Sequence, residues 1–421
     1  MIKEASHLDI SLFKRKALHW ASSFCTVSVF DSNNFNDTYS KFDWLLAAEN
    51  LDELKVDADT SFIDLKSFRQ KYPNQWLPGF LSYDLKNEVE DLTSENPDQL
   101  QFPQLYFFVP KHILILRNDQ LEIISAEAEK IWEEIEATEI SPAEKVSLQI
   151  KPKISKEGYL KKVNQIKQHI VRGDIYETNF CQEFYAENVE INPISVFEEL
   201  NALSPTPFAC YFKAYDKHIL SASPERFLAK RKQQLISQPI KGTASRAASL
   251  QEDERQKNLL KNSIKEKAEN VMIVDLVRND LTKIAVPGTV AVEELFGVYS
   301  FRQVHQMIST VTATLATNID LIDAIKSAFP PGSMTGAPKL RAMQLAEEFE
   351  VSKRSIYAGS VGYFSPDDDF DFNVIIRTIL YNSTQRYLSF QVGSAITFQS
   401  EPEAEYEECL LKASAMLRIL S

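Results

Sequence analysis

The residues around Lys241 could position a nucleophile. Pro239 fixes its own backbone angle φ and restricts the residue before it, while Gly242 leaves the backbone free to turn directly after the lysine. An amine held between a stiff residue and a pliable one could attack an electrophilic carbon, provided that it is deprotonated. Because most lysines are solvated surface groups, the spacing alone leaves a surface role open as the alternative.

Two pairs of glutamates could hold a metal ion. Glu266 and Glu269 are three residues apart in a long expected helix, and Glu405 and Glu408 repeat that spacing near the C-terminus. Side chains three residues apart leave a helix on one face. If the two helices meet, four carboxylates face one cavity and need a hard divalent cation, and magnesium fits better than zinc because no histidine or cysteine joins them. A solvated, glutamate-rich helix face is the alternative.

Two other features could bind an anion. In residues 333–339, small residues lead into a helix which Pro338 could open, and the free amides at such a helix start suit a carboxylate. An ordinary turn is the alternative. Arg377 lies in the apolar run 373–380, which is expected to be a buried strand. An arginine there needs a partner, either an acid of the protein or a carboxylate of a ligand.

The hydrophobic pattern predicts the elements that must carry these residues. The first 125 residues are rich in strand signals, an acidic helix follows at residues 127–139, and the dipeptide Ser141-Pro142 marks a lobe boundary. Strands and long helices then alternate irregularly. This order favours an α+β fold with two lobes. We expect a sheet-rich N-terminal lobe at residues 1–145 and a catalytic region at residues 146–421.

Capping signals place two of the helices. Ser155 can cap a helix that Gly173 ends, and Ser400 with Glu403 forms a capping-box pattern with Pro402 at the first helical position. The longest helix is expected at about residues 249–277. The expected strands are at residues 21–30, 79–83, 105–109, 112–116, 121–125, 174–183, 210–215, 218–222 and 226–229.

Composition excludes several classes of protein. The chain of 421 residues is 44% apolar and carries a formal charge of -13, so it can bury a large core but offers no basic surface for nucleic acid. Its four cysteines lie far apart, which argues against a zinc knuckle or a disulfide framework. No stretch approaches the length of a membrane span, and the first twenty residues do not form a signal peptide. We expect a cytoplasmic protein with no membrane partner.

Taken together, the motifs resemble those of the chorismate-utilising enzymes, the family of aminodeoxychorismate synthase component I and anthranilate synthase component I. The likeness is strong from about residue 155 to the end of the chain and weak before it. It implies antiparallel β-sheets packed with helices. The strings that carry the resemblance occur in the family's order, at residues 239–243, 275–280, 333–339, 359–364 and 401–412.

Within that family, the residue at position 241 separates the activities. Anthranilate synthases usually carry a small residue there, and aminodeoxychorismate synthases carry lysine, as this chain does. The resemblance implies that Lys241 attacks C2 of chorismate, that Glu225 protonates the departing C4 hydroxyl, and that ammonia then opens the adduct at C4. Thr243 is the third catalytic residue that the resemblance implies. We expect a lowered pKa for Lys241 and a raised pKa for Glu225.

The resemblance also assigns the ligands of the metal and of the substrate. Glu269 and Glu408 are implied as direct magnesium ligands, with Glu266 and Glu405 holding water molecules on the ion. The implied substrate-binding residues are Glu177, Gln306, Ser333, Tyr357, Arg377, Gly393 and Lys412.

Two positions depart from the family pattern. Glu177 stands where ammonia-using relatives commonly carry glutamine and where the water-using isochorismate synthases carry lysine. Gln306 stands where anthranilate synthases often carry a histidine that is linked to the loss of pyruvate. The absence of that histidine fits an enzyme that keeps the pyruvyl group on its product.

The resemblance therefore implies magnesium-dependent amination of chorismate to 4-amino-4-deoxychorismate, a step toward para-aminobenzoate and folate. No glutaminase Cys-His-Glu arrangement is evident, so ammonia is expected from a separate glutamine amidotransferase subunit. Two alternatives stay open at this point. One is anthranilate synthase component I, which aminates C2 and eliminates pyruvate, and the other is a non-catalytic regulatory subunit that binds chorismate or tryptophan.

Overall fold

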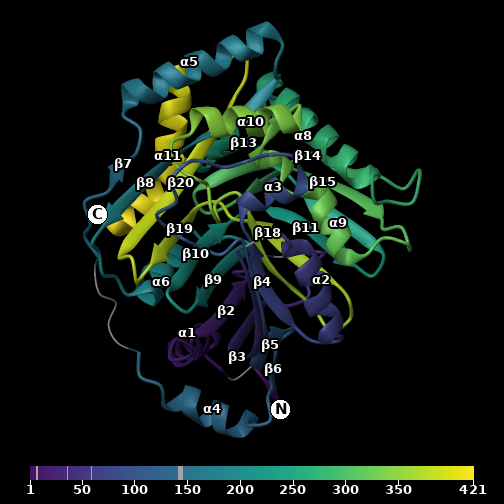
Figure 1. The fold of residues 1–421 in the computed structure, drawn as a ribbon. Helices are drawn as coiled ribbons and strands as arrows, with labels where there is room; N and C mark the ends of the chain where they lie inside the picture. Colours follow the sequence, from purple (N-terminus) through teal and green to yellow (C-terminus); the bar gives the residue numbers. More distant parts are fainter. Residues whose placement is uncertain (6–7, 36, 58, 141–145) are drawn as a thin grey trace.

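Strands from both ends of the chain join in one large antiparallel sheet system. The structure is a computed structural model that describes residues 1–5, 8–35, 37–57, 59–140 and 146–421. Within these ranges twenty strands belong to one connected sheet, and helices cover it on several sides (Figure 1). The predicted α+β class with antiparallel sheets is confirmed. The expected lobe boundary at Ser141-Pro142 lies outside the described residues.

The N-terminal part is a meander of long strands with helices at its edges. Pro110 lies inside β5, which had been expected as two strands, because the partner strand β3 carries a bulge between Asn50 and Asp52 opposite it. The elements are β1 (Ile2–Glu4), α1 (Ile10–Ala21), β2 (Thr26–Asp31), β3 (Trp44–Val56), α2 (Ser61–Lys71), β4 (Leu77–Leu81), α3 (Lys86–Val89), β5 (Leu105–Arg117), β6 (Gln120–Ile124) and α4 (Ala128–Ala137).

The C-terminal part carries the longest helices and the remaining strands. The elements are β7 (Lys151–Pro152), α5 (Lys156–Arg172), β8 (Glu177–Glu187), α6 (Pro193–Leu203), β9 (Phe208–Ala214), β10 (Lys217–Ser223), β11 (Arg226–Arg231), β12 (Gln234–Gln238), β13 (Ile240–Ser245), α7 (Leu250–Asn262), α8 (Ile264–Thr282), β14 (Ala291–Ser300), β15 (Val304–Thr314), α9 (Leu321–Ala328), β16 (Gly336–Ala337), α10 (Lys339–Phe349), β17 (Ser360–Phe364), β18 (Phe370–Val374), β19 (Thr378–Asn382), β20 (Tyr387–Ile396) and α11 (Pro402–Leu420).

Three local predictions about helices can be checked against their caps. Ser155 accepts a hydrogen bond from the Gly158 amide at 3.1 Å and Gly173 ends α5 with φ of 85°, so that prediction is confirmed. The single helix expected at 249–277 is wrong, because Ser263 ends α7 and caps α8 through its side chain. The capping box expected at Ser400 is also wrong, since α11 begins after Glu401 with no side-chain cap.

The two ends of the chain share strands. In Figure 1 the early strands, in purple and blue, continue into the teal and green strands of the later chain. Strand β2 pairs with β9 along its whole length, and β4 pairs with β17. The proposed division at residue 145 therefore separates two parts of one sheet system.

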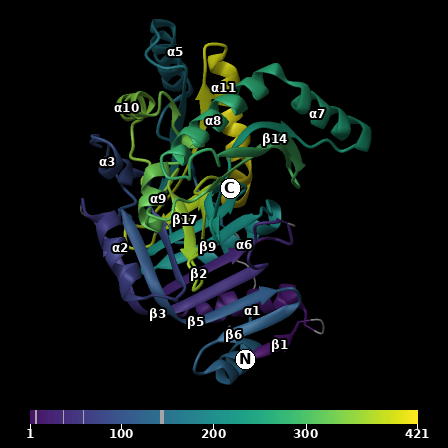
Figure 2. The same cartoon turned by 90° about the vertical axis from the view of Figure 1, so that its right-hand side faces the viewer.

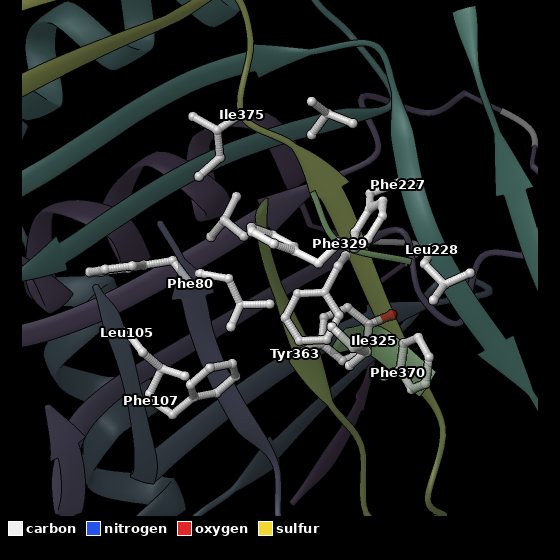
Figure 3. Close-up of a cluster of buried hydrophobic side chains, with 14 of the residues drawn as sticks. Phe80, Leu105, Phe107, Phe227, Leu228, Ile325, Phe329, Tyr363, Phe370 and Ile375 are labelled. Carbon is white, nitrogen blue, oxygen red and sulfur yellow. The ribbon is translucent and has the colours of Figure 1, made fainter. Parts of the chain in front are cut away.

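The hydrophobic core also draws on both parts. Figure 3 shows Phe80 and Phe107 from β4 and β5 in the same cluster as Phe227 and Tyr363 from β11 and β17. Burying such large aromatic side chains stabilises the fold by about 1.5–3 kcal/mol each relative to exposure. Within the described ranges, no helix combines the length and the apolar character needed to cross a bilayer.

Two helices face the strands that matter for the site. Helix α8 lies against β13 and β15, and α11 lies against β20. Figure 2 shows both helices above the sheet, on the side away from the N-terminal strands. This packing brings the glutamates of α8 and α11 toward the lysine of β13.

Candidate active site

A cavity of about 470 Å³ collects most of the predicted site residues. It lies among β13, β20, α8 and α11, so it is built from segments that are far apart in the sequence. Of the predicted residues, only Glu177 and Glu405 are absent from its lining. Those that line it are Glu225, Lys241, Thr243, Glu266, Glu269, Gln306, Ser333, Tyr357, Arg377, Gly393, Glu408 and Lys412.

Lys241 reaches this cavity from an irregular part of β13. The pairing of β13 with β15 shifts register between Ile240 and Thr243, where Gly242 adopts φ of 97°. A Cβ atom on Gly242 would lie 3.0 Å from a carboxylate oxygen of Glu266, so the backbone approaches α8 closely. Glycine suits this bend because it adopts the positive φ without strain and has no Cβ atom to contact Glu266.

The amine of Lys241 is paired with a buried acid. Its Nζ donates a hydrogen bond to Oε1 of Glu177 at 2.6 Å, and the two side chains are only 10% and 1% exposed. Burial alone would lower the pKa of Lys241, but the negative charges of Glu177, Glu269 and Glu408 together raise it above its ordinary value. The expectation of a lowered pKa is wrong for this arrangement, because the acids outweigh the desolvation.

Glu225 has the opposite kind of surroundings. It is buried on the connection between β10 and β11, and burial raises its pKa to about 7. Hydrogen bonds from the Ser333 side chain and from the Ile240 amide oppose this shift without cancelling it. The predicted rise is confirmed, and a carboxyl with this pKa carries its proton in a large fraction of molecules at neutral pH.

The four predicted metal ligands do not all reach the cavity. Glu266, Glu269 and Glu408 line it, whereas Glu405 is buried beside Lys265 without lining it. Oε1 of Glu269 is buried and accepts no hydrogen bond from the described residues. Burial raises the pKa of Glu269 to about 7, and the positive charges of Lys241 and Lys265 oppose this shift without cancelling it.

Lysines balance these acids in the structure. Lys412 donates to Glu408 at 2.7 Å, and Lys265 lies 3.8 Å from Glu269. Although burial opposes it, the Lys412 ammonium lowers the pKa of Glu408. Across the described part of the chain, no three histidine, cysteine, aspartate or glutamate side chains are gathered closely enough to hold a metal ion. The carboxylate oxygens are hard donors, and Oε1 of Glu269 accepts no hydrogen bond from the described residues, so the set nevertheless fits a hard cation.

Arg377 supplies positive charge on another wall of the cavity. It lies between β18 and β19 with φ of 52°, so the expectation of a continuous strand at 373–380 is wrong. Burial lowers its pKa to about 10, with Glu225 opposing that shift. Among the described residues Arg377 forms no ion pair, and the guanidinium therefore remains available to a carboxylate of a ligand.

The remaining predicted residues frame the cavity. Gly393 lies on β20 where a Cβ atom would be 2.6 Å from the sulfur of Cys181, and its carbonyl accepts a hydrogen bond from Lys412 at 2.9 Å. Tyr357 is buried, and Gln306 is buried with an Oε1 that has no hydrogen-bond partner among the described residues. Thr243 lies opposite Gln306 in the pairing of β13 with β15.

Sequence reasoning missed two features of the site. Lys265 lines the cavity and pairs with Glu269 four residues later, a spacing that could have drawn attention to it. The pairing of Glu177 with Lys241 was also missed, and it joins residues 64 positions apart. No local signal in the sequence marks such a pair, because it depends on where the fold places β8 relative to β13, two strands that are not paired with each other.

Comparisons with known proteins place this chain in a family of enzymes that bind chorismate. The profile of a protein family described as chorismate binding enzyme matches residues 15–418. Aminodeoxychorismate synthase component 1 from Klebsiella aerogenes is 34% identical over 362 residues, which cover 83% of this chain and 80% of that protein. The protein of the same name from Bacillus subtilis is 33% identical over 366 residues, which cover 81% of this chain and 76% of the relative.

A solved structure agrees with this fold over nearly its whole length. Anthranilate synthase component I from Streptococcus pneumoniae superposes with a TM-score of 0.77 at 26% identity, covering 91% of this chain and 94% of the other. The menaquinone-specific isochorismate synthase from Escherichia coli gives a TM-score of 0.76 at 18% identity, covering 96% of this chain and 91% of that one, a likeness of fold alone.

Proposed function

Because this chain belongs to the chorismate binding enzyme family, we propose that it aminates chorismate at C4 to give 4-amino-4-deoxychorismate, on the way to para-aminobenzoate and folate. One observation carries the choice of this reaction within the family. A lysine amine, Lys241, enters the cavity from β13 and lies within the charge field of three glutamates. Relatives named aminodeoxychorismate synthase component 1 are similar over most of the chain, which supports the same choice.

The chemistry proceeds in two substitutions. The neutral amine of Lys241 forms a bond to C2 of the ring as the C4 hydroxyl leaves, and ammonia then forms a bond to C4 as the lysine departs. Glu225 donates its proton to the leaving hydroxyl, which departs as water. Its pKa of about 7 supports this role, because the group must hold a proton at neutral pH and release it within the cycle.

Binding of chorismate requires local positive charge. Chorismate is a dianion and the protein carries a formal charge of -13, so long-range attraction does not favour the encounter. Arg377 has no competing acid within an ion-pair distance among the described residues, and Lys412 lies across the cavity. We assign to these two cations the carboxylate groups of the substrate, with Ser333, Tyr357 and Gly393 completing the walls.

Magnesium is the proposed cofactor. When bound, it would offset the negative charge of a substrate carboxylate and of the surrounding glutamates. Glu269 and Glu408 would hold it directly, and Glu266 would act through water. Glu405 was predicted for the same role as Glu266, but it does not line the cavity and lies beside Lys265 instead. The buried Oε1 of Glu269 supports this assignment, since it accepts no hydrogen bond from the described residues and its nearest cation there, Nζ of Lys265, lies 3.8 Å away.

The proposed source of ammonia is a second protein. The relatives are named component 1, a name that implies a further component, and the described residues line the cavity without a cysteine nucleophile. We assign the missing glutamine-hydrolysing step to a separate amidotransferase subunit. A cytoplasmic location agrees with the four free cysteines, of which Cys25 is exposed.

Anthranilate synthase is the second candidate, because the superposed structure from Streptococcus pneumoniae has that activity in its name. It would require loss of the pyruvyl group from C3. Gln306 cannot act as the acid or base that a histidine at that position would supply, so the site favours retention of the group. A regulatory subunit without activity would have no need of the paired charges around Lys241.

A turnover assay separates these candidates. The purified chain is incubated with chorismate, magnesium chloride and ammonium chloride, and the products are resolved by mass and by the fluorescence of anthranilate. We expect aminodeoxychorismate, together with a covalent chorismate adduct when ammonia is left out. Lys241→Ala should abolish the adduct, whereas Lys161→Ala, an exposed lysine on α5, should form it like the parent. Anthranilate as the main product, or an undiminished adduct in Lys241→Ala, would overturn the proposal.

A further inference from the structure

Glu177 is held in place by more than its own strand. It begins β8, and its backbone pairs with Ala337 of the two-residue strand β16. The amide of Tyr176 donates to the Ala337 carbonyl at 2.7 Å, and the amide of Asn179 donates to the Thr335 carbonyl at 2.8 Å. The backbone on both sides of Glu177 is thus fixed to residues 335–337, and the side chain leaves from a rigid position.

The contacts of this side chain are unusually few. Oε1 accepts one hydrogen bond, from Nζ of Lys241 at 2.6 Å, while the buried Oε2 has no hydrogen-bond partner among the described residues. In the same part of the chain, Nζ of Lys241 donates to no acceptor other than Glu177. Each of the two groups is therefore the hydrogen-bonded countercharge of the other.

A lysine in this state is not yet a nucleophile. An ammonium group has no lone pair, so a proton must leave Nζ before a carbon-nitrogen bond can form. The other ionisable groups that bear on Lys241 are Glu225 from the β10–β11 connection, Glu266 and Glu269 from α8, and Glu408 from α11, with Lys412 and Arg377 as cations beside Glu225. None of these forms a hydrogen bond to Nζ, and only Glu177 is within reach of the proton.

We propose, granting the amination proposed above, that Glu177 is a catalytic residue that takes the proton from Lys241 and keeps it while the lysine nitrogen is bonded to the substrate. Both side chains are largely buried, and in a buried site a neutral acid and amine cost less desolvation than an ion pair. Because Oε2 has no other partner, the carboxyl group can turn once it carries the proton. That turn exposes the lone pair of Nζ to the ring of the substrate.

The protons balance over the cycle. The proton of Nζ moves to Glu177, the amine bonds to C2, and the C4 hydroxyl takes the proton of Glu225 and leaves as water. Ammonia then bonds to C4 as the C2–N bond breaks, and the new C4 ammonium returns a proton to Glu225. The lysine leaves as a neutral amine and recovers its proton from Glu177. A glutamine at position 177 could accept the same hydrogen bond but could not store a proton.

The test compares adduct formation in the parent chain and in Glu177→Gln across pH. Both are mixed with chorismate and magnesium chloride without ammonia, and the adduct is quantified by mass after rapid quenching, from about pH 6 to about pH 9. The variant must lose its proton to solvent, so at neutral pH it should form the adduct roughly 10²-fold more slowly. The ratio of the parent rate to the variant rate should fall as pH rises, because solvent then removes the proton from a growing fraction of Lys241 in the variant. Titration of Glu225 affects both proteins alike and cancels in this ratio.

A second glutamate of the same strand serves as the control. Glu183 is also buried on β8, but it does not line the cavity. The Tyr387 hydroxyl donates a hydrogen bond of 2.9 Å to its carboxylate. Glu183→Gln should leave the ratio at one throughout the pH range. A ratio for Glu177→Gln that does not change with pH, or a variant faster than the parent, would overturn the role of Glu177. If the parent itself forms no adduct, the proposed amination through Lys241 fails. If the parent forms the adduct but Glu177→Gln shows no pH-dependent loss, only the proposed role of Glu177 fails.

Discussion

Gly336 is a position where one added carbon should disable the site without touching the substrate. It belongs to β16, and a Cβ atom built on it would lie 2.2 Å from the carbonyl oxygen of Glu177 and 2.8 Å from Cα of Thr178. Both of these atoms are backbone, so no flexible side chain can move aside. Gly336→Ala must therefore separate β16 from the start of β8.

The size of the displacement follows from the contact. Carbon and oxygen atoms approach to about 3.3 Å at the closest in sheets, so relief of a 2.2 Å contact requires a shift of about 1 Å. A misplacement of about 1 Å in a catalytic group can cost 10²-fold in rate, equivalent to about 2.7 kcal/mol of activation free energy. Overpacking of this kind also costs about 1–3 kcal/mol of folding free energy.

The assay measures both effects in one preparation. Steady-state amination with chorismate, magnesium chloride and ammonium chloride gives kcat and KM, and thermal unfolding gives the change in stability. We expect kcat to fall roughly 10²-fold. KM for chorismate should change little, because Arg377 and Lys412 do not lie on the displaced strands.

Gly173→Ala is the matched control. Gly173 ends α5 with φ of 85°, and a Cβ atom there would meet no atom within 4 Å. The left-handed conformation alone should cost this variant about 1–2 kcal/mol of stability while leaving kcat unchanged. A Gly336→Ala variant with kcat within a factor of about three of the parent would refute the reasoning, because the backbone contact would then not control Glu177.

Three further perturbations test other parts of the site and the fold. Glu225 must be protonated to act, so kcat/KM should fall as pH rises above about 7, and a pH–rate profile of Glu225→Gln should show a loss of roughly 10²–10⁴-fold without that limb. Glu269→Gln and Glu408→Gln should lose the stimulation by magnesium and should bind the ion more weakly when binding is measured by calorimetry. Glu403 is exposed, and Glu403→Gln should behave like the parent. Full activity of Glu269→Gln or Glu408→Gln in the presence of a chelator would contradict the metal assignment. His218 is buried and burial lowers its pKa to about 4, so the unfolded chain binds an additional proton between about pH 4 and pH 6.5 and stability should decline by on the order of 3 kcal/mol as pH falls through that window. His218→Phe should flatten this decline in denaturant titrations, and an unchanged slope would show that His218 is not its source.

Much of the site could be predicted from the sequence because its chemistry is carried by short strings. Lys241 beside Pro239 and Gly242, and the glutamates three apart on two helices, are local patterns whose spacing survives folding. The structure brings Glu225, Lys241 and Glu269 to one cavity from three separate elements. Chain order alone cannot provide that convergence, because it depends on which strands become neighbours in the sheet.

The sign of the shift at Lys241 shows where such reasoning stops. A dry site alone lowers the pKa of a lysine, and this was the basis of the sequence-based expectation. The structure adds the charges of Glu177, Glu269 and Glu408, of which only Glu177 lies within hydrogen-bonding distance. Whether these charges raise the pKa of Lys241 more than burial lowers it depends on distances in the folded structure. The spacing of residues along the chain does not give those distances.

Breaks in regular structure were equally difficult to predict. Val374, Ile375 and Ile376 are strong strand formers, and they predicted a strand that continues through Arg377. The strand instead ends, and Arg377 takes a positive φ that directs the chain from β18 into β19. Ser263 divides α7 from α8, and its side chain accepts a hydrogen bond from the Glu266 amide, which is left without a helical carbonyl partner where the new helix begins.

Residues 333–339 have a structural role that their small side chains explain. Arg354 donates to the Met334 carbonyl at 2.7 Å and to the Asn179 carbonyl at 2.9 Å, and it pairs with Glu350, so one buried guanidinium ties this segment to β8. Lys339 in turn donates to Asp280 of α8 at 2.9 Å.

The segment thus connects the strand that carries the proton acceptor with the helix that carries two of the glutamates. Larger side chains at Gly336 or its neighbours would separate these elements, since the backbones meet there without intervening space. Among these residues Ser333 and Met334 line the cavity, and the Ser333 side chain forms a hydrogen bond with Glu225. We expect this segment to keep Glu177, Glu225 and Glu269 at fixed separations, so a substitution outside the cavity should reduce kcat more than it changes KM.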